Sequence, residues 1–297
     1  MPAIIIAVVT IGVILALLNG LLGGGKGGNG GQWQNEGYQL PEYQANKPAL
    51  PTVTSLNKAE ELTKNNKLYQ QTLASPVRCE LDRIDATKAS EAEIKTQLEK
   101  QQECLLRVWG PALEAAGYQP VRSKITVYSG AAQSACGKLP RRNAVYCSLD
   151  QNIYVATDLT EITGSLSTEA FVMEAVMAHE FAHSVQGRAG IIGGRNLLAR
   201  AAENEDDQRL LVRRNEAQAD CMATMFFNST QQALSLTDQD KSNIVNTFRA
   251  VGSDRGGNNK PSTHPTMKSR ETWAKKGFAT LEVKACNAYT VPAGEVK

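Results

Sequence analysis

The stretch AHEFAHSV, residues 178–185, decides the fold and the chemistry of this protein. Residues four apart share one face of a helix, so His179 and His183 can hold one metal ion together. Glu180 is turned about 100° from His179 and can act as a general base on a water at the metal. Two of the three histidines of the chain lie here at ligand spacing. The stretch predicts a zinc-binding helix of the HExxH type and a hydrolytic reaction.

The residues before the motif extend it into a buried helix. From 168 to 185 the chain is apolar on most of its circumference, which indicates a helix covered on several sides. Ser167 or Thr168 is the expected N-cap. Gly187 and Gly190 mark its end, so the two histidines are expected near the C-terminal end of a rigid helix.

A second helical stretch can supply a third ligand. Zinc in a catalytic site takes three protein ligands and leaves a fourth position to water. In RRNEAQADC, residues 213–221, Glu216 and Asp220 are again four apart. One helix face can therefore offer Glu216 to the metal and Asp220 to an imidazole N–H. On spacing alone the two acids are an ordinary solvated pair, but beside an HExxH helix the metal role is favoured. This helix is expected from about 196 to 228, with a solvated acidic run at 203–207.

These motifs together resemble the bacterial neutral zinc metallopeptidase family. The likeness rests on HEFAHSVQ, on RRNEAQADCMA and on a later histidine followed by an arginine, and it covers roughly residues 105–290 in scattered motifs. The resemblance implies a gluzincin fold with an N-terminal membrane segment. It also implies His179, His183 and Glu216 as ligands of one zinc ion per chain, and Glu180 as the catalytic base.

The third histidine lies in the segment STHPT, residues 262–266, with Arg270 beyond it. This segment is similar to one in HtpX-type and CAAX-type membrane peptidases, and Pro265 departs from the glycine common in the neutral metallopeptidase family. His264 is a candidate catalytic residue that donates a hydrogen bond to an oxyanion. Alternatively, it is an extra metal ligand that makes the metal catalytically inactive. A lone loop histidine can equally be structural. Arg270 is expected to form a structural ion pair rather than to bind substrate.

The amino end has the composition of a membrane anchor. Residues 3–22 carry no charge and match the roughly 20 residues that a bilayer core requires. They lack the basic n-region and the cleavage site of a signal peptide, so an uncleaved transmembrane helix is expected at 1–22. A linker rich in glycine and proline is expected at 23–54, followed by the peptidase domain at 55–297. Lys26, after the span, favours a cytoplasmic body by the positive-inside rule.

The six cysteines favour the opposite orientation. They are even in number and contain no CxxC pair, which favours disulfides in an oxidising compartment over a zinc ribbon. The favoured pairs are Cys79–Cys104, Cys136–Cys147 and Cys221–Cys286, although the sequence alone does not fix the connectivity. We therefore expect a single-pass protein of the bacterial inner membrane with its domain on the periplasmic or extracellular side. The alternative is six reduced thiols in a cytosolic domain.

The rest of the pattern predicts an α+β domain, mostly helical, with a small antiparallel sheet. An amphipathic helix follows Ser90 until Gly110–Pro111 breaks or kinks it. Alternating residues predict two or three strands. They lie at 124–128, 144–147 and 152–156, and shorter helices are expected after Ser55, at about 238–248 and at about 266–276. The strand at 152–156 is expected to pair with an extended substrate along its edge.

The expected function is that of a membrane-anchored zinc metallopeptidase acting on a peptide or protein substrate. The 32 basic and 30 acidic residues nearly balance, so no nucleic-acid partner is expected. A different class of protein, a tethered binding or scaffold module with structural zinc, is the alternative. Glu180 discriminates between them, because a structural site needs no base beside its metal. A zinc hydrolase acting on another amide, such as cell-wall peptide, is a further enzyme alternative.

Overall fold

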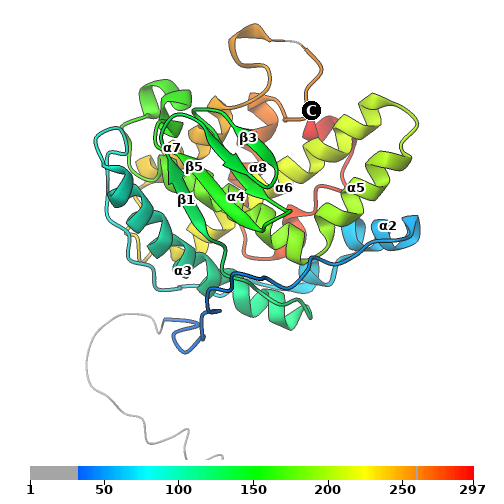
Figure 1. Ribbon diagram of the computed structural model, residues 1–297, viewed down its shortest axis with the longest axis horizontal. Helices are drawn as coiled ribbons and strands as arrows, with labels where there is room; N and C mark the ends of the chain where they lie inside the picture. The colour runs from blue at the N-terminus through cyan, green and yellow to red at the C-terminus, as the bar shows by residue number, and fades with distance from the viewer. Residues whose placement is uncertain (1–32, 259) are drawn as a thin grey trace, which may run out of the picture. The chain divides into compact units, whose positions relative to one another are not determined.

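The structure is a computed structural model that describes residues 33–258 and 260–297 (Figure 1). Within these ranges no helix is both long and apolar enough to cross a bilayer. The transmembrane helix expected at 1–22 lies outside the described residues, as does the first part of the expected linker. Residues from Trp33 to Lys297 belong to one unit.

Helices form most of the regular structure, as the sequence predicts, and the fold is α+β. In chain order the elements are α2 (Leu56–Lys64), α3 (Glu91–Ala115), β1 (Ile125–Tyr128), β2 (Ala132–Ser134), β3 (Gly137–Leu139), β4 (Ala144–Cys147), β5 (Asn152–Ala156), α4 (Val172–Arg188), α5 (Ile191–Ala201), α6 (Glu205–Thr230), α7 (Asp238–Ala250) and α8 (Met267–Phe278). The short 3₁₀ helices between them are η1 (Lys67–Gln70), η2 (Leu159–Leu166), η3 (Arg255–Gly257), η4 (Val283–Cys286) and η5 (Ala293–Val296).

The sheet is mixed and not antiparallel as predicted from the sequence. Its order is β1-β5-β4, in which β4 and β5 are antiparallel and β1 runs parallel to β5. The short turn between β4 and β5 imposes antiparallel pairing, whereas the long connection after β1 allows a parallel partner. Strand β5, residues 152–156, is therefore central, so the prediction that it offers an edge to substrate is wrong. The open edge beside α4 belongs to β4.

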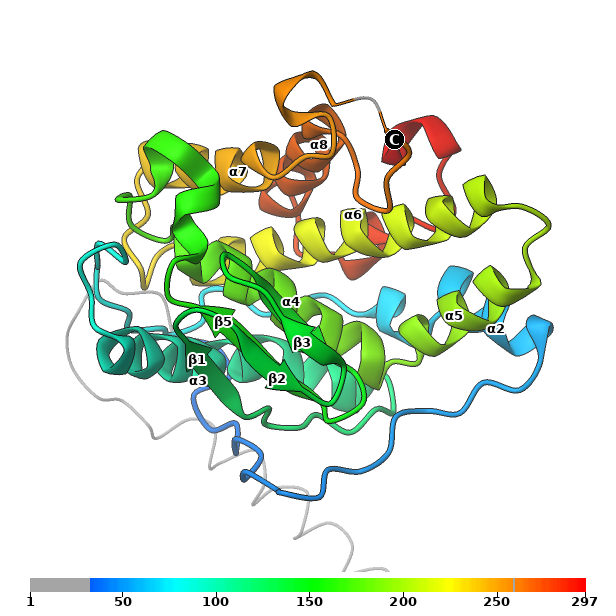
Figure 2. The same ribbon diagram turned by 45° about the horizontal axis from the view of Figure 1, so that its top comes forward.

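Helix α4 lies between the sheet and α6. It packs against β4 and against α6, and α8 packs on α6 (Figure 2). Large apolar side chains that are at most 2% exposed fill the core, among them Trp109, Phe181 and Phe226. Because nearly every residue of α4 is buried, its two histidines stand on a rigid element.

Helices α6 and α8 approach each other closely at Gly277. A Cβ atom at this position would lie 2.0 Å from the carbonyl oxygen of Cys221 and 2.2 Å from Oγ1 of Thr224. Those distances are far inside van der Waals contact, so only glycine permits this packing distance. The same helix carries Arg270 about two turns earlier, on the same face.

Helix α3 continues through Pro111 to Ala115 and does not end at Gly110–Pro111, where the sequence predicts a break or a kink. Proline lacks the N–H that would bond to the carbonyl four residues earlier, which is that of Arg107. The side-chain amide of Asn35 donates to this carbonyl at 2.9 Å and replaces the missing bond. A residue from outside the helix thus completes it.

The predicted start of the metal-binding helix is also wrong. Helix α4 begins at Val172 and not after Ser167, and its N-cap position is Phe171 in a left-handed conformation with φ 66°. The ring of Phe171 is buried and packs edge-on against Phe227, with centroids 6.4 Å apart. Burial of this ring, rather than a side-chain cap, determines where the helix begins.

The single helix expected at 196–228 is two helices, α5 and α6. Asn204 separates them, because its side-chain oxygen accepts the N–H of Asp207 and caps α6. The acidic residues at 205–207 therefore lie in the first turn of α6, where the helix dipole stabilises their negative charges. They are exposed, as expected.

Residues 33–54 run along the domain and bond to it. Arg188, at the end of α4, donates through Nη1 to the carbonyl of Pro48 at 2.8 Å and to that of Ala49 at 3.2 Å. The side-chain amide of Gln151 also donates to Pro48. This segment of the chain is thereby attached to both α4 and the turn before β5.

The three disulfides expected from the sequence are confirmed. They join Cys79 to Cys104, Cys136 to Cys147 and Cys221 to Cys286. The first ties α3 to the segment before it, the second ties the β2–β3 hairpin to β4, and the third ties α6 to η4. Every cysteine of the chain is paired.

Candidate metal centre

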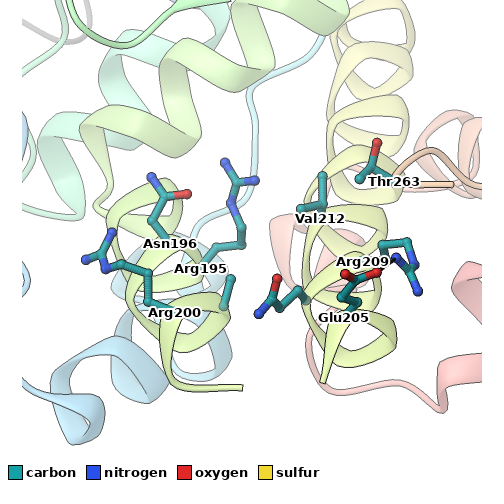
Figure 3. Close-up of a pocket in the computed structure, with 9 residues that line it drawn as sticks. Arg195, Asn196, Arg200, Glu205, Arg209, Val212 and Thr263 are labelled. Carbon is teal, nitrogen blue, oxygen red and sulfur yellow. Dashed lines mark hydrogen bonds and ion pairs between the residues drawn. The ribbon is translucent and has the colours of Figure 1, made fainter. Parts of the chain in front are cut away.

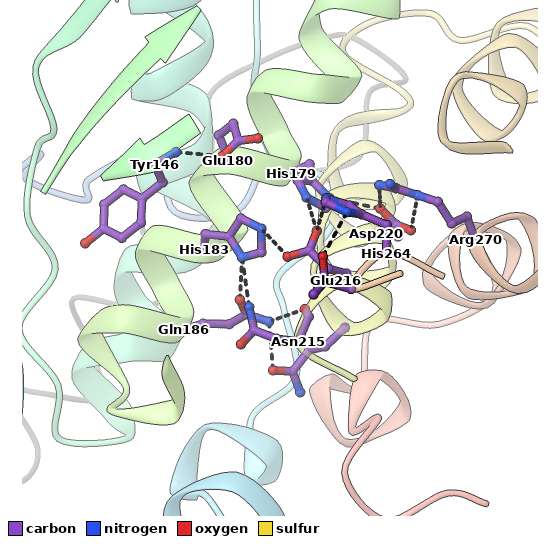
Figure 4. A network of polar contacts seen from close by, with 12 residues as sticks. Tyr146, His179, Glu180, His183, Gln186, Asn215, Glu216, Asp220, His264 and Arg270 are labelled. Carbon is purple, nitrogen blue, oxygen red and sulfur yellow. Dashed lines mark hydrogen bonds and ion pairs between the residues drawn. The ribbon is translucent and has the colours of Figure 1, made fainter. Parts of the chain in front are cut away.

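Two histidines of α4 and one glutamate of α6 point at one place (Figure 4). His179 Nε2 lies 3.3 Å from one carboxylate oxygen of Glu216, and His183 Nε2 lies 3.4 Å from the other. One ligand atom from each of the three side chains lies within 4.8 Å of the others. The structure thus brings together the three residues that are predicted from the sequence as ligands.

The spacing and the chemistry of these donor atoms fit zinc. Tetrahedral zinc with bonds of about 2.0–2.1 Å places neighbouring ligand atoms about 3.3–3.4 Å apart. His179 Nε2 lies at about that distance from one oxygen of Glu216, and His183 Nε2 lies at about that distance from the other. Two imidazoles and one carboxylate are also a ligand set of catalytic zinc sites, which leave one position open.

The charges of the site favour a cation between its side chains. Burial alone would lower the pKa of His179, but Asp220 and Glu216 outweigh it and raise this pKa to about 10. Burial alone would raise the pKa of Glu216, but the imidazoles of His183 and His179 hold it well below its usual range. A buried carboxylate that stays ionised beside two imidazoles is suited to bind a proton or a metal ion.

His179 is oriented by a buried ion pair. Its Nδ1 lies 2.9 Å from Asp220 Oδ1, the position at which the sequence predicts an acceptor. Arg270 donates to both oxygens of Asp220, at 2.7 and 3.0 Å. The carboxylate of Asp220 favours a proton on Nδ1 of His179, and a neutral imidazole of that tautomer keeps the lone pair of Nε2 free for a metal. Arg270 is thus paired inside the protein, as expected.

His183 is oriented by Gln186, a residue that was not predicted from the sequence. His183 Nδ1 lies 2.7 Å from Gln186 Oε1, so a neutral imidazole donates there and presents Nε2 to the metal. Gln186 is fully buried and donates in turn to the carbonyl of Asn215 and to Gln218 Oε1. The only sequence signal was a glutamine three residues after the second histidine.

Glu180 is held by the edge of the sheet. The backbone N–H of Tyr146, on β4, donates to Glu180 Oε2 at 2.7 Å (Figure 4). Glu180 is 7% exposed, and it lines the cavities on both sides of the site. Sequence reasoning could not find this contact, because it depends on how β4 packs on α4.

The third histidine also reaches the site. His264 Nε2 lies 3.8 Å from Glu216 Oε2, and 54% of its side chain is exposed. The carbonyl of Ser262 accepts a hydrogen bond from Arg213 of α6 at 2.8 Å, which fixes the loop that carries His264. His264 is close enough to meet a substrate and lacks the tight contacts of the other two histidines.

Two cavities meet at the site. One, of about 230 Å³, extends toward η2 and α7, and its wall includes Phe248. The other, of about 350 Å³, extends along β4 toward α5, and its wall includes Ile192. We call them the α7-side cavity and the α5-side cavity. Glu180, Glu216 and His264 line both, so an extended ligand can cross the site.

These features define the class of protein. An HExxH helix and a glutamate from a second helix form a possible metal site, and the carboxylate of Glu180 lines the cavities beside it. A family model described as "Putative neutral zinc metallopeptidase" matches residues 107–289. The chain belongs to this family.

Two relatives with similar sequences are themselves uncharacterised. The "Uncharacterized protein YpfJ" of Escherichia coli (strain K12) is 31% identical over 193 residues, which cover 61% of this chain and 66% of the relative. The "Uncharacterized protein Rv2575" of Mycobacterium tuberculosis (strain ATCC 25618 / H37Rv) is 30% identical over 207 residues, which cover 62% of this chain and 66% of the relative. The chain thus spans just under two thirds of the length of these relatives. No solved structure matches the chain.

Proposed function

We propose that this protein is a zinc-dependent peptidase that hydrolyses peptide bonds with Glu180 as general base. The observation that carries the proposal is the place of Glu180, which is next to the three ligands and lines both cavities. A structural zinc site is closed by four protein ligands and has no use for an adjacent base. The gluzincin type follows from the third ligand, a glutamate on a second helix.

Each of three residues has its own role in the proposed hydrolysis. Zinc, when bound, supplies a Lewis acid that activates water and polarises the peptide carbonyl. Glu180 takes a proton from the attacking water and returns it to the leaving amine. The N–H of Tyr146 holds one carboxylate oxygen of Glu180, which leaves the other free to carry the proton. We assign His264 the role of hydrogen-bond donor to the oxyanion, because its side chain is half-exposed beside Glu216.

The open edge of β4 is suited to bind an extended peptide. The N–H of Ala156 donates to the carbonyl of Asn143, so backbone groups of alternate β4 residues face β5. Ala144 and Tyr146 then face the open edge, as the contact of Tyr146 with Glu180 illustrates. Pairing with Ala144 would hold a peptide backbone without selecting its side chains.

We propose that the protein is anchored in the bacterial inner membrane with its domain outside the cytoplasm. Three disulfides support this location, because such bonds persist in oxidising compartments. The uncharged run at residues 3–22 supports the anchor. The proposed partners are a peptide or protein substrate and the membrane.

Zinc analysis and a protein-substrate assay with and without chelator test the function. Glu180→Gln should keep about one zinc per chain and lose cleavage by about 10²-fold or more, because it removes the base and leaves the ligands. His183→Ala should lose both zinc and cleavage. Glu99→Gln, on the exposed side of α3, is the matched control and should behave as wild type.

Two outcomes would contradict this proposal. Cleavage that survives Glu180→Gln would exclude the glutamate as base. Wild-type protein that holds zinc and cleaves no peptide or protein would favour the tethered binding module.

A further inference from the structure

A cavity of about 660 Å³ lies between α5 and α6, next to the candidate site (Figure 3). We call it the arginine cavity, because the charged residues of its wall are three arginines and one glutamate. They are Arg195, Arg200, Arg209 and Glu205. Thr263, the neighbour of His264, also lines this cavity. The wall therefore carries an excess of positive charge close to the proposed catalytic residues.

The three arginines differ in what they contact. Arg209 is paired with Glu205 at 2.8 Å and with Asp206 at 2.7 Å, so its charge is balanced. Arg200 is exposed at the end of α5, and in Figure 3 its guanidinium points away from the gap between the helices. Arg195 points into that gap. Among the described residues, no carboxylate forms an ion pair with Arg195.

Arg195 is also incompletely bonded inside the protein. Its side chain is partly buried, and its Nε is shielded from solvent without a hydrogen-bond partner. A guanidinium has five N–H donors in a planar fork that matches a carboxylate. A partly desolvated guanidinium without an acceptor is therefore a strong site for an anion.

Arg195 belongs to the walls of two cavities. Besides the arginine cavity it lines the α5-side cavity, together with Glu180, His183 and Glu216. The two acids of that cavity are the proposed base and the proposed ligand, and neither forms an ion pair with Arg195. A ligand bound at the metal centre and extending toward α5 must pass this guanidinium.

We propose that Arg195 binds a carboxylate of the peptide substrate on the α5 side of the metal centre. This inference rests on the proposed peptidase function. The α5-side cavity is lined by Arg195 as well as by Glu180, His183 and Glu216, so its occupant lies beside the metal centre. The carboxylate therefore belongs to a residue close to the scissile bond. It is either an acidic side chain or the free C-terminus of a short substrate.

Peptide binding to the full chain in detergent, carrying Glu180→Gln and loaded with zinc, tests the proposal without turnover. One set of C-terminally amidated peptides compares glutamate with glutamine at each position near the scissile bond. A second pair compares a free C-terminal carboxylate with its amide. The peptide with the carboxylate should bind about tenfold more tightly in one of the two comparisons, which identifies the source of the carboxylate.

Substitutions of Arg195 then show whether this side chain causes the preference. Arg195→Ala should reduce the tenfold ratio to about one and leave the zinc content unchanged, and Arg195→Lys should retain part of the ratio. Arg200→Ala removes the same charge from the same helix and should keep the full ratio. If Arg200→Ala reduced the affinity ratio as much as Arg195→Ala does, the preference would come from the general positive charge of the region and not from direct contact with Arg195. That result would overturn the proposal.

Four further results are decisive, and the last two separate this proposal from the proposed function. A preference that survives Arg195→Ala, or an equal loss of binding for acid and amide peptides, would overturn the carboxylate site. Cleavage by wild-type protein without any preference for acid would overturn that site alone. An Arg195-dependent preference without any cleavage by wild type would overturn the peptidase function and keep the carboxylate site.

Discussion

Glu174 is a buried acid that the proposed reaction does not use. It lies on α4 between one and two turns before His179 and is 1% exposed. Its Oε1 accepts a hydrogen bond from Gln97 at 2.8 Å, and among the described residues it has no ion pair. Burial raises the pKa of Glu174, and the hydrogen bond from Gln97 opposes this only in part. The folded protein therefore keeps Glu174 protonated at pH values where the unfolded chain has lost the proton.

The sign of the resulting pH dependence can be predicted. The stability that comes from the protonated group is complete below the pKa of an unfolded glutamate, about 4.3, and is lost as pH rises toward the folded pKa. Glu174→Gln removes this loss and keeps an oxygen for Gln97. The unfolding free energy of Glu174→Gln, relative to wild type, should therefore rise between pH 4 and pH 7.

Urea denaturation with chelator present measures this difference without a contribution from metal release. Glu99→Gln, on an exposed part of α3, should show no such trend. A constant difference between Glu174→Gln and wild type across this pH range would show that folding does not raise the pKa of Glu174.

At this scale, spacing predicts only part of the site. The two pairs at positions i and i+4 place His179, His183, Glu216 and Asp220 together, because helical periodicity converts sequence spacing into direction. Gln186 was not predicted, because one more polar residue on a helix carries no distinctive spacing. The contact of Tyr146 with Glu180 and the place of Arg195 in the wall of the α5-side cavity depend on tertiary packing, which no local pattern encodes.

At the scale of elements, helix α6 carries the proposed ligand Glu216 and is joined by a disulfide to η4, near the C-terminus. The disulfide between Cys221 and Cys286 closes a span of 65 residues, from the middle of α6 to η4. The disulfide between Cys136 and Cys147 closes only 11 residues beside β4. A longer closed loop restricts the unfolded chain more strongly.

Removal of these two disulfides should therefore have unequal costs. Replacing both Cys221 and Cys286 by alanine should lower the unfolding free energy by about 4 kcal/mol, and replacing Cys136 and Cys147 by about 3 kcal/mol. At about 2–4 °C per kcal/mol, calorimetry should show the larger fall in Tm for the first pair. An equal or smaller fall would mean that loop closure does not determine their contribution.

The existence of elements was easier to predict than their partners. The three strands of the sheet lie at the predicted residues, because alternation is local. Their order β1-β5-β4 is not local, and this order makes β4 the open edge. In the same way, Pro111 is a correct signal of a missing hydrogen bond, but Asn35, 72 residues from its partner Arg107, supplies the replacement.

At the scale of the whole molecule, the three disulfides and the uncharged run at 3–22 support one proposed location. The disulfides favour an oxidising compartment, whereas Lys26 alone favours the cytoplasm. We give the disulfides more weight, because each contributes about 2–4 kcal/mol and a single basic residue is a weak determinant of orientation.

Two measurements on cells that express the full chain test this location. Protease added to spheroplasts should digest the domain and spare a cytoplasmic marker. Alkylation of denatured, unreduced protein should label no native cysteine, whereas Leu149→Cys, at a position that is 74% exposed, should label once. A protected domain with six reactive thiols would place it in the cytoplasm.

The close approach of α6 and α8 at Gly277 affects how the proposed metal ligand His179 is oriented. Helix α8 holds Arg270 against Asp220, and Asp220 holds His179, so the separation of α6 and α8 sets where that imidazole points. Because a Cβ atom at Gly277 would lie 2.0 Å from the backbone of α6, any other residue there must push the helices apart. A methyl group at Gly277, two turns along α8 from Arg270, should therefore lower zinc affinity by moving Arg270 away from Asp220.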